Sequence, residues 1–145
     1  MKIEQISIFL ENKPGRLNEI CRTLADNKLN IVTLSLADTQ QFGIVRLIIK
    51  DWVRAQQVLE ANGYVVNVRQ VVAATVPDRP GGMVEVLDII SSAGVNIEYM
   101  YAFTSRRGTA AVVIFRFDDP DKAVAALTTA GHDVLHPVEL FKDSE

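Results

Sequence analysis

A motif that occurs twice at one spacing constrains this chain more than any other feature. Residues 12–17 read Asn-Lys-Pro-Gly-Arg-Leu and are followed by Leu-Asn-Ile at 29–31. The related strings Asp-Arg-Pro-Gly-Gly-Met at 78–83 and Val-Asn-Ile at 95–97 return 66 residues later. Repetition of both the motif and its spacing predicts two copies of one small unit.

The apolar residues that follow each Pro-Gly support this division. Both sets have the i, i+3, i+4, i+7 spacing of a helix with one buried face. They are Leu17, Ile20, Cys21 and Leu24 in the first copy, and Met83, Val86, Leu87 and Ile90 in the second. We therefore expect two domains, at residues 1–70 and 71–145. Units of that size are only marginally stable when alone, so the copies are expected to share a core or an interface.

Alternating and helical patterns predict the order strand, helix, strand, strand, helix, strand in each copy. In the first copy the elements are a strand ending at Asn12, a helix over 15–27, strands over 30–38 and 43–49, a helix from Trp52 closed by Gly63, and a strand over 64–70. This order is typical of an α+β, ferredoxin-like (βαββαβ) fold with antiparallel sheets and both helices on one face. Residues 71–76 are strand-like without a flexible spacer, so the copies are expected to be joined directly and held fixed relative to each other.

Composition excludes several classes of function. The chain is 48% hydrophobic and 23% charged, as in compact soluble proteins, and carries no apolar run near the roughly 20 residues of a membrane span. Its start has no signal-peptide pattern, so we expect a cytoplasmic protein without a membrane partner. A net charge of −3 argues against nucleic acid, and Arg106-Arg107 is expected to be a solvated hairpin tip.

Catalytic and metal-binding patterns are sparse. Cys21 falls on the apolar helical stripe and is expected to be a small core residue. His132 and His136 lack companions for a metal site and are expected at the surface or a strand edge. No glycine-rich nucleotide fingerprint occurs. We expect no catalytic residue, no metal and no cofactor.

With both motifs placed on these elements, the chain resembles tandem ACT-domain proteins, whose small ferredoxin-like modules bind amino acids and commonly regulate amino-acid metabolism. The resemblance covers about residues 3–140. It implies that ligands lie between neighbouring modules, against the loop before the first helix and the Asn that opens the second strand. The implied ligand-binding residues are Asn12, Gly15, Arg16, Leu17, Asn30 and Ile31 in the first copy, and Asp78, Gly81, Gly82, Met83, Asn96 and Ile97 in the second.

The residue types suit a free amino acid. Backbone N–H groups at a helix start can donate to its carboxylate, and Asn12 or Asp78 can accept from its ammonium. Asp78 is charged, which favours the second copy as the tighter site. In the alternative interpretation, Asn12 and Asp78 only cap their own helices, and Asn30 and Asn96 complete turns.

Tyr99, Tyr101 and Phe103 alternate along one predicted strand and share a face. Alignment with the first copy places them away from the helices, where they would pack against another module or chain and favour a homodimer. If the register is inverted, they are ordinary core residues.

The sequence thus predicts a non-catalytic, amino-acid-binding regulatory protein that acts on a separate enzyme or regulator. The alternatives are a regulatory subunit resembling the small subunit of acetolactate synthase, a dimerising scaffold without a ligand, and a small ferredoxin-like hydrolase.

Overall fold

The computed structural model describes residues 1–38 and 41–142, apart from the side chains of residues 104 and 105. Two compact units divide the chain. One is Glu4–Arg69, called here the first module; the other combines Gln70–Lys142 with Met1–Ile3 and is called the second module. The boundary falls inside a strand.

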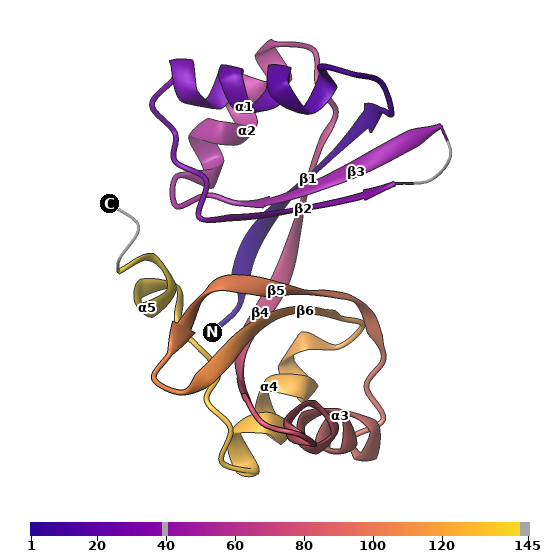
Figure 1. Ribbon diagram of the computed structural model, residues 1–145, viewed down its shortest axis with the longest axis vertical. Helices are drawn as coiled ribbons and strands as arrows, with labels where there is room; N and C mark the ends of the chain where they lie inside the picture. Colours follow the sequence, from indigo (N-terminus) through magenta and orange to yellow (C-terminus); the bar gives the residue numbers. More distant parts are fainter. Residues whose placement is uncertain (39–40, 143–145) are drawn as a thin grey trace. The chain divides into compact units, whose positions relative to one another are not determined.

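Four strands and two helices build the first module (Figure 1). Its elements are β1 (Ile3–Glu11), α1 (Arg16–Asp26), β2 (Thr33–Asp38), β3 (Phe42–Ile48), α2 (Trp52–Ala61) and the beginning of β4 (Val66–Pro77). The strands lie in the order β2–β3–β1–β4, and β3 is antiparallel to both β1 and β2. The fold is α+β, as the patterns predicted.

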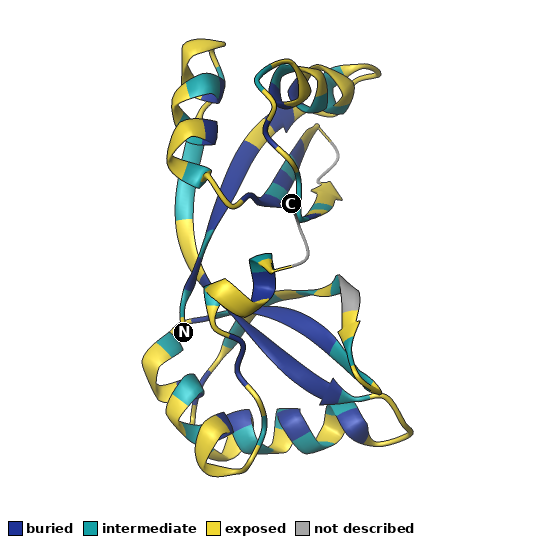
Figure 2. Cartoon of the chain, turned by 90° about the vertical axis from the view of Figure 1, so that its left-hand side faces the viewer, coloured by how far each residue is buried: buried dark blue, intermediate teal, exposed yellow. Residues whose placement is uncertain are grey.

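Register explains which face of this sheet carries the core. Ile8 lies opposite Val45 and Ile6 opposite Leu47, and these side chains are fully buried in one cluster with residues of both helices. The helices contribute Ile20, Leu24, Ala55 and Leu59. Each fully buried aliphatic side chain of this size contributes about 1.5–3 kcal/mol, so this one-sided core holds α1 and α2 on the sheet. Figure 2 shows the buried and exposed faces of the helices.

The second module repeats most of this plan. It contains the end of β4, α3 (Gly82–Ser92), β5 (Ile97–Arg107), β6 (Ala110–Phe117), α4 (Pro120–Thr129) and α5 (Pro137–Phe141). Strand β6 is antiparallel to both β4 and β5. Its core includes Val113 with Phe115 and Phe117, whose stacked rings have centroids 5.2 Å apart.

Two expectations about the strands were wrong. The strand that ends the first copy and the one that begins the second are a single strand, β4. The second copy also lacks a full fourth strand among the described residues, because only Val134 forms a bridge, with Ala74. Pro137 has no backbone N–H to continue a ladder, and α5 begins there instead.

His136 lies at the surface, as expected, and caps α5. Its Nδ1 accepts a hydrogen bond from the Val138 N–H at 3.2 Å, and its own N–H donates to the Glu139 carboxylate at 3.1 Å. This reciprocal capping box satisfies helix-end donors that would otherwise lack partners. It accounts for a helix that the histidine spacing did not indicate.

The expectation for Cys21 was also wrong. The buried residues of α1 are Ile20 and Leu24, whereas Cys21 is only half-buried and lies outside the core cluster. The apolar stripe is therefore narrower than its sequence spacing suggested.

Gly82 provides a test of the packing at the start of α3. A Cβ at this position would lie 1.9 Å from the Pro77 carbonyl oxygen, whereas a Cβ at Gly15 meets nothing within 4 Å. We expect Gly82→Ala to lower the free energy of unfolding by about 3 kcal/mol or more, because backbone must move. Gly15→Ala should cost about 1–2 kcal/mol, the penalty of a left-handed backbone. Urea unfolding of both variants checks the order, and a smaller loss for Gly82→Ala would contradict this packing.

Candidate functional site

The two Pro-Gly turns leave their helices without a side-chain cap. Gly15 and Gly81 are the N-caps of α1 and α3, with left-handed φ angles of 87° and 84°. Within residues 1–38 and 41–142, no side chain caps either helix, whereas Asp51 and Asp119 cap α2 and α4. Asn12 and Asp78 therefore do not cap their own helices, which removes the alternative interpretation of these two residues.

A cavity of about 200 Å³ adjoins the first of these turns. Its walls come from the end of β1, the following loop, α1, β2 and β3. The lining residues are Leu10, Glu11, Asn12, Lys13, Leu17, Leu36, Asp38 and Gly43. Three leucines form an apolar surface, and the charged and amide side chains lie along the loop and the strand end. The predicted residues Asn12 and Leu17 both line this cavity.

Charge in this cavity is mostly acidic. Lys13 Nζ lies 2.7 Å from a Glu11 carboxylate oxygen. That hydrogen bond, and then the lysine charge, lower the pKa of Glu11 below its usual value, so Glu11 stays ionised to lower pH than an isolated glutamate. Asp38 has no cationic partner within the described part of the chain. Two carboxylates and one ammonium leave a net charge of −1, which favours a cationic group on a ligand.

Sequence reasoning missed the charged residues Glu11, Lys13 and Asp38 and the wall residues Leu10, Leu36 and Gly43. Leu10 and Gly43 are directly opposed in the β1–β3 register, and Leu36 is opposed to Val45 in β2–β3. Because side chains alternate along a strand, the sequence could show that Leu36 and Asp38 share one face of β2. It could not show that β2 lies beside β3 and the start of α1.

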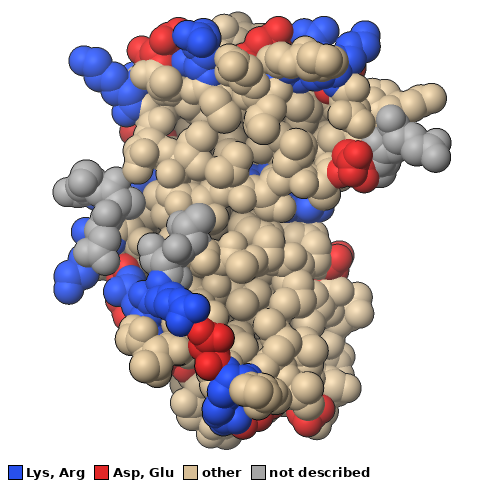
Figure 3. Space-filling model, in the orientation of Figure 1, with Lys and Arg blue, Asp and Glu red and all other residues tan. Residues whose placement is uncertain are grey.

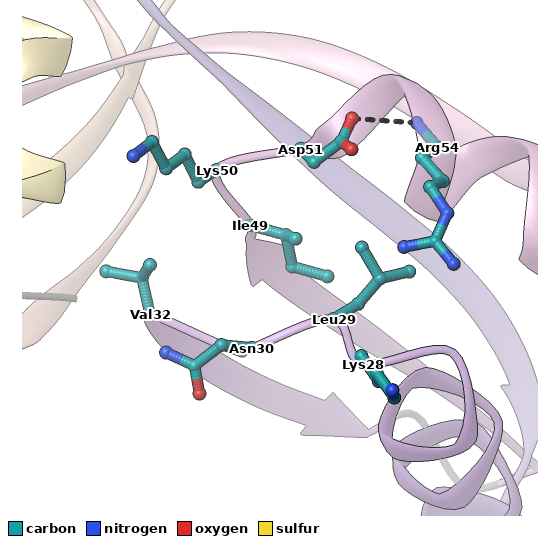
Figure 4. A pocket seen from close by; sticks show the side chains of 8 residues that line it. All are labelled: Lys28, Leu29, Asn30, Val32, Ile49, Lys50, Asp51 and Arg54. Carbon is teal, nitrogen blue, oxygen red and sulfur yellow. Dashed lines mark hydrogen bonds between the residues drawn. The ribbon is translucent and has the colours of Figure 1, made fainter. Parts of the chain in front are cut away.

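The other predicted residues of the first copy lie elsewhere. Gly15 is the N-cap of α1, and Arg16, the first residue of that helix, forms an ion pair with Glu19 at 3.2 Å. Asn30 lines a different cavity of about 400 Å³, shown in Figure 4, and its neighbour Ile31 packs against the module core. Within one module, the loop residues and the Asn-Ile pair therefore do not meet in one cavity.

In the second module, the corresponding loop carries internal ion pairs. Asp78 lies 2.6 Å from Arg106, and Arg79 lies 2.5 Å from Glu85. Arg107 donates a hydrogen bond to the Glu139 carbonyl oxygen. The two arginines end β5 beside the turn at Gly108, as expected, and each also has a protein partner.

The remaining predicted residues of the second copy have structural partners. Gly82 is buried against Pro77, and Met83 and Ile97 pack against the module core. The backbone N–H of Asn96 donates to the Asp118 carboxylate at 2.9 Å. Gly81 supplies the left-handed turn.

Tyr99 and Tyr101 of β5 lie on the sheet face away from the helices, as predicted. Tyr99 is opposed to Arg116 and Tyr101 to Ile114, whereas the helix-facing residues Phe115 and Val113 are opposed to Met100 and Ala102. Phe103 falls where the β5–β6 register is irregular. The register excludes a core position for the two tyrosines.

A short network ties α1 to the segment between α2 and β4. Tyr64 donates to a Glu19 carboxylate oxygen at 3.3 Å, and Arg16 contacts the same carboxylate. Burial, and then the negative charge of Glu19, raise the pKa of Tyr64 above its usual value. The network therefore connects the start of α1 with residues that precede β4.

The pKa of Tyr64 should consequently lie above the usual value of a tyrosine side chain. Its raised pKa means that its neutral form is favoured by folding, so its stabilisation is present at neutral pH and is lost as pH rises through that pKa. We expect Tyr64→Phe to remove a component of the ultraviolet titration of the folded protein that ionises above that usual value. Loss of a component that ionises at or below it would contradict the network.

Other kinds of site find little support in the described residues. No group of three or more His, Cys, Asp or Glu residues there is placed to hold a metal ion. No described helix is long and apolar enough to span a membrane. Figure 3 shows basic and acidic side chains intermixed over α1 and α2 on the face in view.

Comparison with known proteins identifies related chains. A family model described as an ACT domain pair matches residues 1–141. The crystal structure of a protein from Bacteroides thetaiotaomicron is 39% identical with a TM-score of 0.89, covering 98% of this chain and 97% of that one. No curated protein matches the sequence.

More distant structures share the fold. The regulatory subunit of aspartate kinase from Thermus thermophilus, in a ligand-free form, is 18% identical with a TM-score of 0.64, over 88% of this chain and 92% of that one. The corresponding subunit from Thermus flavus is 16% identical with a TM-score of 0.62, over 88% and 91%.

Proposed function

Because the chain belongs to the ACT domain pair family, we propose that it is a non-catalytic regulatory protein that binds a free amino acid and modulates a separate enzyme or regulator. The Thermus subunits with the same fold are themselves regulatory subunits of a kinase, which supports a regulatory role here. The described residues offer no clustered metal ligands, and the sequence shows no nucleotide fingerprint. We also propose that the protein acts in the cytoplasm.

The observation that carries this proposal is the uncapped start of α1 beside the 200 Å³ cavity. Backbone N–H groups in a first helical turn have no intrahelical acceptor, and here no described side chain supplies one. Together with the helix dipole, they favour a carboxylate. The cavity is smaller than the roughly 300–1,000 Å³ of sites for drug-sized molecules, which suits a single amino acid.

A zwitterion matches the distribution of charge. Its carboxylate would lie toward the α1 N-terminus and Lys13, and its ammonium toward Asp38, Glu11 and the Asn12 amide oxygen. The leucines would contact its side chain. We place the principal site in the first module because Asp78, the equivalent of Asn12, is already paired with Arg106 in the second. In a neighbouring module, Asn30 and Ile31 or Asn96 and Ile97 would complete such a site, as the family resemblance implies.

Regulation then requires that the amino acid binds one arrangement of the protein more tightly than another. A ligand that favours one arrangement of the protein over another couples to a partner by typically about 1–3 kcal/mol, a 5- to 150-fold effect of that order. The chain would sense the amino acid, and its partner would respond.

A thermal-shift screen against the twenty amino acids tests the proposal. A ligand at ~100 times its Kd adds about 2.7 kcal/mol of stability, so one or a few amino acids should raise Tm clearly. Asn12→Ala should weaken that binding by about 1–3 kcal/mol, because the ligand loses a hydrogen bond to its charged group.

Asn18→Ala is the matched control for this variant. Asn18 is an exposed residue of α1 outside the cavity, and its replacement should leave affinity unchanged. No Tm shift with any amino acid would favour the scaffold alternative. Equal affinity in both variants would remove Asn12 from the site.

We propose further that the protein is a homodimer. Strand β2 is an edge strand of the first module, and its Leu34 and Leu36 are 43% and 52% exposed. Exposed leucines on an edge strand are typical of a surface that pairs with another chain.

Replacement of Leu34 by lysine tests the dimer by sedimentation. We expect Leu34→Lys to shift the protein toward monomer, because an ammonium would be buried at the interface. Val53→Lys on α2, where Val53 is 48% exposed, should leave the dimer intact. A monomeric wild-type protein would contradict the proposal.

A further inference from the structure

One position of the first module's sheet, inside the proposed amino-acid site, has no side chain. On the helix-facing side, residues of β2, β3 and β1 form rows across the sheet. In successive rows the central residue, from β3, is Leu47, then Val45, then Gly43. Gly43 is directly opposed to Leu10 of β1 and to Asp38 of β2. The central side chain thus becomes smaller along β3 and is missing in the row that lines the cavity.

The missing side chain leaves space between two leucines of the cavity wall. A Cβ at Gly43 would lie 3.3 Å from Leu36 Cδ1 and 3.5 Å from Leu10 Cδ2. All three residues line the 200 Å³ cavity. A methyl group at Gly43 would therefore occupy this space and displace Leu36 by a few tenths of an ångström. Leu36 is 52% exposed, so its side chain has room to move.

The backbone does not require glycine at this position. Gly43, unlike Gly15, does not have a positive φ angle. Glycine weakens the interior of a strand, and it often marks a place where a ligand or another backbone approaches closely. Around Gly82 the nearest atoms belong to the backbone of Pro77, whereas the three nearest atoms around Gly43 belong to leucine side chains. A closely approaching backbone therefore does not account for Gly43, and a ligand in the cavity would.

The second module has alanine at the equivalent position. Ala111 of β6 is opposed to Val76 of β4, as Gly43 of β3 is opposed to Leu10 of β1. Leu10 and Val76 each lie two residues before the polar residue that opens their Pro-Gly loop. Alanine therefore fits this place in the sheet, and the glycine of the first module coincides with a cavity in that module.

On the basis of the proposed amino-acid site, we propose that Gly43 determines which side chain the ligand has. The ligand is an amino acid with an aliphatic side chain, which lies on the backbone of Gly43 between Leu10 and Leu36. Strand β3 lies between β1 and β2, so its N–H and C=O groups point toward those strands and not into the cavity. A hydroxyl or amide of the ligand at this wall would lose its hydrogen bonds to water without replacement.

Calorimetric titration of the full chain with pairs of amino acids of similar shape tests the class of ligand. Valine is compared with threonine, and leucine with asparagine. We expect valine or leucine to bind, and to bind more tightly than its polar counterpart, by up to about a hundredfold. If threonine, asparagine or lysine binds most tightly, the aliphatic class is wrong, although the protein still senses an amino acid.

Replacement of Gly43 by alanine, which copies the second module, tests the role of the glycine. Gly43→Ala should weaken binding of valine or leucine by about tenfold or more, the scale of one methylene in an apolar pocket. The Tm of the ligand-free variant should not fall, because alanine restricts the unfolded chain more than glycine does.

Ile44→Val is the matched control. Ile44 is the next residue of β3, so its side chain lies on the opposite face of the sheet, and it does not line the cavity. Its replacement should leave affinity unchanged. Unchanged affinity in Gly43→Ala, or an equal loss in both variants, would overturn the role of Gly43 while the amino-acid site stands. If none of the twenty amino acids binds the wild-type protein, the proposed function fails, and the role of Gly43 fails with it.

Discussion

The left-handed turn at Gly15, repeated at Gly81, is the constraint on which the rest of each module depends. The proline that precedes this glycine has a fixed φ angle. Glycine alone then takes the left-handed conformation without strain. The chain can therefore pass from a strand into a helix within four residues. Because glycine is the N-cap, the first N–H groups of the helix gain no side-chain acceptor among the described residues. The same turn that leads into the core thus leaves the start of each helix without a side-chain cap.

At two equivalent positions of the backbone, the two modules carry side chains of different charge. In the second module, two acids have partners within the protein. Arg106 pairs with Asp78, and Asp118 accepts a hydrogen bond from the Asn96 N–H. In the first module, Asn12 and Lys50 stand at the equivalents of those two acids, and each lines a cavity. The first module therefore carries an amide and a cation at the two positions where the second module carries acids.

Local patterns in the sequence predicted local structure. The 3.6-residue periodicity and the Pro-Gly turns predicted α1 and α3, because one helix face and one backbone angle are set by neighbouring residues. They did not predict that β4 is continuous, or that His136 caps a helix, since these depend on what pairs with the chain. Asp38 entered the cavity only through the pairing of β2 with β3.

A regulatory response needs a ligand to favour one of two arrangements, since equal affinity for both shifts nothing. The small cavity is suited to this because its apolar wall joins three elements, through Leu10 of β1, Leu17 of α1 and Leu36 of β2. A side chain that fills it ties these elements together. At the same end of α1, Glu19 accepts from Tyr64, which lies just before β4. Strand β4, which begins just after Tyr64, runs from the first module into the second.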